Sequence, residues 1–93
     1  MDFLELFNAV ARVARPVHVT HNPVLDSTEK LLDTGLDSLD ILMICIYMCE
    51  LYGIDEDAGK NMPAATVEEI REFVMANHTQ QPESVAQAIE AIQ

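Results

Sequence analysis

The chain has 93 residues, the size of one small domain with a modest core and little room for an enclosed active site. About half of the residues (49%) are apolar, so a folded domain is expected rather than disorder. The formal net charge of −11 makes nucleic acids and anionic membranes poor partners, because both require a basic surface. The acidity favours partners with basic patches, although an acidic surface can also serve solubility alone.

The sequence predicts a monomeric protein of the cytoplasm. No apolar run approaches a membrane span, and the first residues are acidic where a signal peptide needs positive charge. The only cysteines, Cys45 and Cys49, are a poor framework for a disulfide-stapled domain and indicate a reducing compartment. No metal site is expected, because His18 and His21 supply only two ligands and surface histidines are the commoner interpretation.

The first predicted helix begins at Asp2, whose carboxylate can form a capping box with Glu5, and it ends before Pro16. Its apolar residues recur at three- and four-residue spacing, at Phe3, Phe7, Val10 and Ala14. Residues 16–35 show no sustained period and are interpreted as a long connection.

Three further helices and one short helical fragment follow. One helix begins near Asp37 and runs to about Tyr52, with Gly53 as its C-terminal stop. A short turn or helical fragment follows at residues 55–61. Thr66 opens the next helix with Glu69 as its capping partner, and that helix ends near Asn77. A last short helix spans residues 84–92, where Ser84 and Gln87 give a capping signal.

The helix after Asp37 is apolar on almost every side. With Ile44 at the centre of its inward face, Met48 and Leu51 fall within about 40°. The opposite side carries Leu39, Leu42, Met43, Ile46, Cys49 and Glu50. An apolar outward side is either covered by another part of the chain or used for docking, and the sequence leaves both alternatives open.

Ser38 stands in the first turn of this helix without a base to activate it. No histidine, cysteine and aspartate are arranged as a triad, so the serine is a poor nucleophile. The hydroxyl suits modification by another enzyme, because a helix N-terminus favours a phosphoryl group. The plain alternative is an ordinary serine in a first helical turn.

The stretch "DTGLDSLD", residues 33–40, followed by an apolar helix resembles the signature of the acyl carrier protein family. The resemblance continues through "YGIDEDAGKNMPAATVEEIREFV" and covers roughly residues 3 to 78. It implies an all-α four-helix bundle of three longer helices and one short helix over residues 1–78. The helix predicted within residues 79–93 is a C-terminal extension that has no counterpart in the family pattern. The resemblance also implies 4′-phosphopantetheine on Ser38, attached by a separate phosphopantetheinyl transferase and carrying acyl groups as thioesters.

The resemblance also implies roles for other residues. The residues expected to dock partner enzymes are Asp37, Leu39, Asp40, Leu42, Met43, Ile46 and Glu50. The residues expected to line an acyl pocket are Ile44, Met48, Ile70 and Val74. The partners would be the transferase and acyl-transferring or chain-extending enzymes with basic or apolar docking patches. Met43 and Cys49 stand where the family commonly has acids, which favours a specialised member in fatty-acid, polyketide or related biosynthesis.

A second hypothesis is an unmodified acidic adaptor that uses the same apolar helix face. Enzymatic activity is not expected, because no base or metal constellation accompanies Ser38. The last helix is expected to pack on the bundle rather than trail free. Its expected cover is the helix ending near Asn77 or the outward side of the helix that begins at Ser38.

Overall fold

The computed structural model of the protein describes residues 2–14, 26–34 and 36–92. Its elements are the helices α1 (Phe3–Ala14), α2 (Ser38–Tyr52), α3 (Glu56–Gly59), α4 (Val67–Asn77) and α5 (Val85–Ile92), with a 3₁₀ helix η1 (Leu31–Thr34) before α2. No strand forms within these ranges, where an isolated bridge pairs Lys30 with Thr66. The predicted all-α class is confirmed. Pro16, His18 and His21, with most of the predicted connection, lie outside the described residues.

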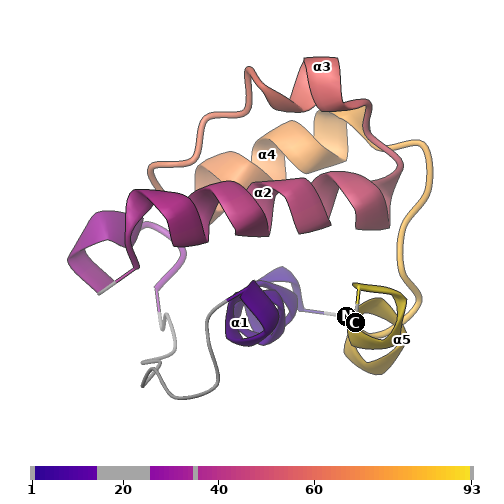
Figure 1. Ribbon diagram of the computed structural model, residues 1–93, viewed down its shortest axis with the longest axis horizontal. Coiled ribbons are helices and arrows are strands. Elements are labelled where there is room, and N and C mark those ends of the chain that lie inside the picture. The colour runs from indigo at the N-terminus through magenta and orange to yellow at the C-terminus, as the bar shows by residue number, and fades with distance from the viewer. Residues whose placement is uncertain (1, 15–25, 35, 93) are drawn as a thin grey trace.

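Helix α2 lies at the centre of the molecule (Figure 1). It contacts α1, α3, α4 and α5, and its most extensive packing is against α1. In the view of Figure 1, α1 and α5 lie on one side of α2, while α3 and α4 lie on the other. The helix with the most apolar sequence is therefore the one that most of the fold covers.

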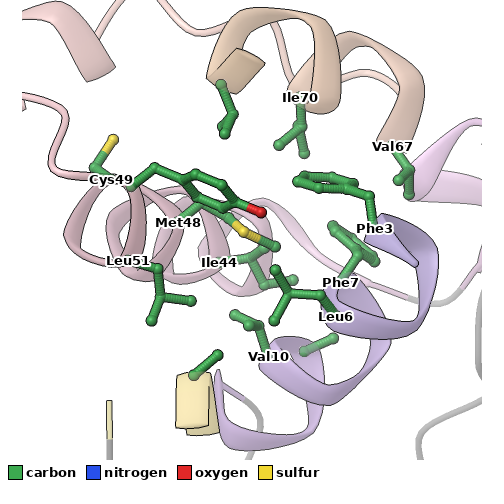
Figure 2. Packing of buried hydrophobic residues seen from close by; sticks show 14 of the residues in the cluster. Phe3, Leu6, Phe7, Val10, Ile44, Met48, Cys49, Leu51, Val67 and Ile70 are labelled. Carbon is green, nitrogen blue, oxygen red and sulfur yellow. The ribbon is translucent and has the colours of Figure 1, made fainter. Parts of the chain in front are cut away.

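The core fills the space between α1, α2 and α4 (Figure 2). The fully buried side chains at its centre are Leu6, Phe7 and Val10 of α1, Ile44 and Met48 of α2, and Ile70 and Val74 of α4. Burying each such side chain contributes about 1.5–3 kcal/mol before entropy is counted. The inward face predicted for α2 from periodicity is confirmed.

The ends of α2 are those predicted from its caps. Asp37 is the N-cap residue, and Gly53 ends the helix in the left-handed region at φ 64°. The Gly53 N–H donates to the Glu50 carbonyl at 3.4 Å, and the Ile54 N–H donates to the Cys49 carbonyl at 2.9 Å. These two bonds form a Schellman motif, and glycine suits its left-handed position because it has no Cβ to clash there.

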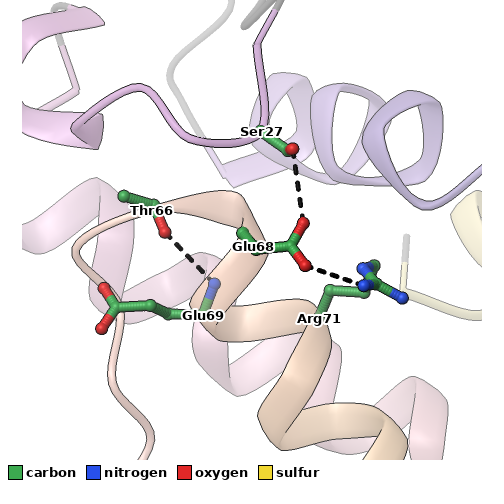
Figure 3. Close-up of polar contacts among 5 residues, drawn as sticks. All are labelled: Ser27, Thr66, Glu68, Glu69 and Arg71. Atoms are coloured by element: carbon green, nitrogen blue, oxygen red, sulfur yellow. Dashed lines mark hydrogen bonds and ion pairs between the residues drawn. The ribbon is translucent and has the colours of Figure 1, made fainter.

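The segment before α2 is held against the start of α4 (Figure 3). The Ser27 carbonyl accepts from the Glu68 N–H at 2.9 Å, and the Leu31 N–H donates to the Ala65 carbonyl at 2.8 Å. The Glu68 carboxylate accepts from the Ser27 hydroxyl at 3.4 Å and from the Arg71 guanidinium at 2.8 Å. The Arg71 hydrogen bond lowers the pKa of Glu68. Residues 26–34, which lead to Ser38, are thus anchored to the second half of the chain.

Of the two hydrogen bonds in the capping box predicted at α4, the one to the threonine side chain forms. The Thr66 hydroxyl accepts from the Glu69 N–H at 3.2 Å, as expected. One carboxylate oxygen of Glu69, Oε1, is buried and has no hydrogen-bond partner within the described ranges. The structure therefore shows the threonine half of the box, and α4 begins at the predicted place.

Thr79 and Gln80 cap the C-terminal end of α2. The Tyr52 carbonyl accepts from the backbone N–H groups of Thr79 and Gln80, at 2.9 and 3.3 Å. The Thr79 hydroxyl donates to the Gly53 carbonyl at 2.7 Å, and the Gln80 amide donates to the Glu50 carbonyl at 3.3 Å. These bonds satisfy carbonyls that a helix end otherwise leaves to solvent.

Helix α5 packs against α1 and α2, with Ala88 fully buried. The Gln87 N–H donates to the Ser84 hydroxyl at 3.1 Å, which confirms the predicted capping signal. The elements against which α5 packs differ from both alternatives expected from the sequence. The principal partner is α1 rather than α4, and Leu39, Leu42 and Ile46 on the outward side of α2 stay exposed.

Removal of residues 79–93 should lower the free energy of unfolding by at least about 2 kcal/mol. The deletion removes four hydrogen bonds to the end of α2, each contributing about 1 kcal/mol, and the packing of α5 on α1 and α2. Thermal unfolding would show a fall of roughly 10 °C for a domain of this size. Glu90→Ala, an exposed change on α5, is the control. Equal midpoints for the truncated and full chains would contradict the described packing.

Candidate functional site

Ser38 is exposed as the first residue of α2. Its neighbours form a complete capping box around it. The Asp37 carboxylate accepts from the Asp40 N–H at 2.8 Å, and the Asp40 carboxylate accepts from the Asp37 N–H at 3.3 Å. Two aspartates therefore define the helix start, and the serine hydroxyl between them lies at the surface where another molecule can reach it.

The two aspartates are not equally available to a partner. Asp37 is exposed, but Asp40 is only 9% exposed and belongs to the buried residues. The expectation that both acids meet a partner surface is corrected for Asp40, because its carboxylate turns back to the backbone of Asp37. A capping box requires this geometry, so the acid at that position stabilises the helix start.

Beside Ser38, α2 carries an exposed apolar stripe. Leu39, Leu42 and Ile46 are 66%, 55% and 39% exposed, and their spacing places them on one face of the helix. Met43 is half-buried and Glu50 is exposed. Helix α5 leaves the stripe uncovered, so the alternative in which the last helix packs on this outward side is wrong.

Cys49 does not belong to the outward face, contrary to the helical-wheel prediction. It is only 6% exposed. Its sulfur lies so close to α3 that a Cβ atom at Gly59 would be 2.6 Å from the Cys49 Sγ. The four-residue helix α3 therefore covers this part of α2, and the glycine permits the close approach.

A groove of about 340 Å³ lies where α2 meets α3. Its lining consists of Leu42, Cys45, Ile46, Cys49, Ile54 and Gly59, together with the charged residues Glu50 and Lys60. The residues predicted for an acyl pocket lie elsewhere. Ile44, Met48, Ile70 and Val74 are fully buried in the core between the helices and do not line this groove.

Cys45 is half-buried in the groove and has an unreactive thiol. Burial raises its pKa to about 11, and the neighbouring Cys49 contributes to the same shift. Thiolate, rather than thiol, is the nucleophile in cysteine chemistry. At neutral pH, Cys45 therefore behaves as a small apolar side chain.

The described residues offer Ser38 no histidine base. His78 lies at the C-terminal end of α4, with its ring edge-on to Tyr52 at 6.4 Å. Tyr52 is the last residue of α2, at the opposite end from Ser38. Within the described ranges, no three His, Cys, Asp or Glu residues are placed to hold a metal ion. None of the described helices has the length and apolar character needed to cross a membrane.

Comparisons of the chain with family models, curated proteins and solved structures found no match. The exposed serine, the uncovered stripe and the groove are therefore the features that bear on function.

Substitution of Asp37 should distinguish two contributions to the stability of α2, the hydrogen bond of the N-cap and the negative charge of the carboxylate. Asp37→Ala should cost about 1 kcal/mol of stability, because the Asp40 N–H loses its acceptor. Asp37→Asn should lower the free energy of unfolding by only about a few tenths of a kcal/mol, because asparagine is an equally good N-cap residue. Urea unfolding of the two variants measures the difference. A loss of similar size in both would mean that the carboxylate charge, rather than the cap, stabilises α2.

Alkylation of Cys45 should be slow and steeply pH-dependent. With a pKa of about 11 instead of its ordinary 9.0, the thiol holds about 100-fold less thiolate at pH 8 than an exposed cysteine. The rate should rise about tenfold per pH unit up to pH 10, as measured by peptide mapping after timed treatment with iodoacetamide. The urea-unfolded chain is the control. Equal rates in the folded and unfolded chains at pH 8 would show that the groove does not shield the thiol.

Proposed function

We propose that the protein is a carrier of the acyl carrier type, with 4′-phosphopantetheine attached to the hydroxyl of Ser38. The observation that carries the proposal is the exposure of this one serine at the start of α2, within the motif that resembles the family signature. Its neighbours Asp37 and Asp40 complete the cap between themselves. The Ser38 hydroxyl can therefore be modified without removing the capping bonds.

The residues around Ser38 fit the phosphate of such a group. Ser38 stands at the positive end of the α2 dipole, which favours an anion. The Asp37 carboxylate accepts from the Asp40 N–H, so the acid beside the serine is engaged in the helix cap. When bound, the cofactor supplies a thiol that carries acyl groups as thioesters. The chain itself supplies the attachment point and the surface around it.

The exposed stripe of Leu39, Leu42 and Ile46 is the surface that we assign to partner enzymes. It lies on the same helix as Ser38, so an enzyme that reaches the serine or its arm meets these side chains. The partners are the phosphopantetheinyl transferase and enzymes that transfer or extend acyl groups. The stripe favours apolar docking patches on these enzymes, while Asp37 and Glu50, both exposed, favour basic residues at the margin.

The order and lengths of the helices support the same proposal. Three longer helices, α1, α2 and α4, and the short α3 follow the order that the resemblance implies. Helix α5 is the expected addition to this arrangement. The proposal includes a cytoplasmic location and a role in fatty-acid, polyketide or related specialised biosynthesis.

The proposal is tested by the mass of the protein after treatment with coenzyme A and a broad-specificity phosphopantetheinyl transferase. The expected gain is about 340 Da, the mass of the transferred group. Ser38→Ala should abolish the gain and change stability by less than about 0.5 kcal/mol, because the hydroxyl makes no capping bond to its neighbours. Ser84→Ala, at the exposed start of α5, is the matched control and should leave the gain intact.

Two results would contradict parts of the proposal. A mass gain that persists in Ser38→Ala would show that another residue is modified. A wild-type chain that gains no mass would favour the alternative hypothesis, an unmodified acidic adaptor that binds partners through the same stripe.

A further inference from the structure

A pocket of about 510 Å³ lies between α2 and α5, beside the connection that joins α4 to α5. This connection runs past the C-terminal end of α2, to which it is hydrogen-bonded (Figure 1). The buried Leu51 and Ala88 form the base of the pocket, and Gln87 and Ala91 are exposed at its rim. Most of the lining belongs to residues 80–92, so the pocket is a product of the C-terminal extension.

The pocket continues the exposed stripe of α2 at the end far from Ser38. Leu42, Ile46 and Glu50 follow one another at four-residue spacing, which places them in one row along the helix. Glu50 lines the pocket and lies twelve residues beyond Ser38, about 18 Å in helical rise. An enzyme that reaches Ser38 and covers the stripe therefore also meets the opening of the pocket.

The charged side chains at the pocket are acidic. Glu50 belongs to its lining and Glu83 is exposed on the connection, whereas neither α2 nor residues 72–92 contain a lysine or an arginine. Lys60, in the neighbouring groove, pairs with Asp57 at 3.6 Å. Within the described ranges, no side chain forms a hydrogen bond or an ion pair with the Glu50 carboxylate. The charge of the site therefore favours a cationic guest.

Two glutamine side chains at the rim offer hydrogen-bonding groups to such a guest. The Gln80 amide donates to the Glu50 carbonyl at 3.3 Å, and its Oε1 oxygen has no donor among the described residues. The Gln87 Oε1 oxygen accepts from the Glu83 N–H at 2.6 Å, which leaves its amide N–H groups available. The first side chain suits an N–H donor on a cation, and the second suits a carbonyl oxygen beside it.

The base of the pocket suits a long aliphatic stem. Leu51 and Ala88 are apolar, and the small side chain of Ala91 leaves open space beside them. Lysine and arginine lay their stems along such surfaces and keep the charged head near water. Arginine fits better, because its planar guanidinium presents five donors to acceptors on several sides, here Glu50 and Gln80.

A protruding side chain also fits the pocket better than a free small molecule does. Small-molecule sites are mostly apolar and enclose most of their ligand. Here exposed polar side chains, Glu50, Gln80, Gln81 and Gln87, form much of the rim. The pocket is therefore suited to a guest that enters from the surface of another protein.

We propose that this pocket receives an arginine side chain of a partner enzyme that is docked on the exposed stripe of α2. The identity of the partner as an enzyme rests on the proposed carrier function, whereas the arginine site rests on the pocket itself. An enzyme with such an arginine prefers this chain to a carrier that lacks residues 79–93, because the extension supplies most of the site. Helix α5 thereby acts in the selection of partners.

The test titrates the full ¹⁵N-labelled chain with N-acetyl-arginine amide at low salt and follows the backbone amide signals. The signals of residues 50–51 and 80–92 should move together with one dissociation constant. N-acetyl-citrulline amide, which has nearly the same shape without the charge, should bind about fivefold more weakly, the effect of one partly exposed charge pair. N-acetyl-lysine amide should bind about threefold more weakly, because its ammonium matches fewer acceptors at once.

Two pairs of variants locate the site, and all four positions are exposed. Ala91→Leu fills the space above the base and should weaken binding of the arginine amide about tenfold. Ala86→Leu, the same change on α5 outside the lining, should alter it less than about twofold. Glu50→Gln should weaken binding about fivefold, whereas Glu90→Gln, also outside the lining, should weaken it less than about twofold. Thermal unfolding checks that each variant is folded.

Three results would overturn the inference. Signals of Asp55 and Asp57 that move as much as those of the pocket would show general attraction of the cation to acids. Equal binding of the arginine and citrulline amides would remove the role of charge, and equal binding by wild type and Ala91→Leu would remove the pocket. Equal binding of the arginine and lysine amides would overturn the choice of arginine.

Failure of this inference is distinguishable from failure of the carrier function, because the titration does not involve Ser38. If Ser38 gains the cofactor but the pocket binds no arginine amide, the inference fails and the carrier function stands. If the pocket binds the arginine amide but Ser38 gains no mass, the carrier function fails and the arginine site stands as part of an adaptor.

Discussion

The need to cover α2 determines the rest of this fold. The helix is apolar on almost every side, so one neighbouring layer cannot keep it from water. Helices α1 and α5 cover it from one side, and α3 and α4 cover it from the other (Figure 1). What remains uncovered is the start of the helix at Ser38 and the stripe of Leu39, Leu42 and Ile46. The candidate site is thus the part of α2 that the fold leaves open.

The free backbone groups at the two ends of α2 find their hydrogen-bond partners in different ways, and this difference leaves Ser38 accessible. At the N-terminal end, Asp37 and Asp40 bond to each other's backbone, so no distant segment is needed there. At the C-terminal end, Thr79 and Gln80 return from another part of the chain to bond the last carbonyls. Had a returning segment capped the N-terminal end instead, it would have covered the serine.

Local signals in the sequence predict the helices and their ends, because caps and periodicity act within a few residues. Asp37, Gly53 and Thr66 each marked a boundary that the structure confirms. The burial of Cys49 was missed because its cover is α3, which at four residues is too short to show a period. The packing of α5 on α1 depends on contacts far apart in sequence. The groove was missed for the same reason, since small residues create it only where two elements meet.

The size of the exposed stripe bears on the choice between a carrier and an adaptor. Three aliphatic side chains, each contributing about 1.5–3 kcal/mol when fully buried, provide a modest driving force for association. Interfaces below about 1,200 Å² are typical of weak and transient complexes. A permanent adaptor would need a larger contact, whereas a carrier must release each enzyme before it meets the next. A short apolar stripe beside an exposed serine therefore suits brief contacts with several partners better than one lasting complex.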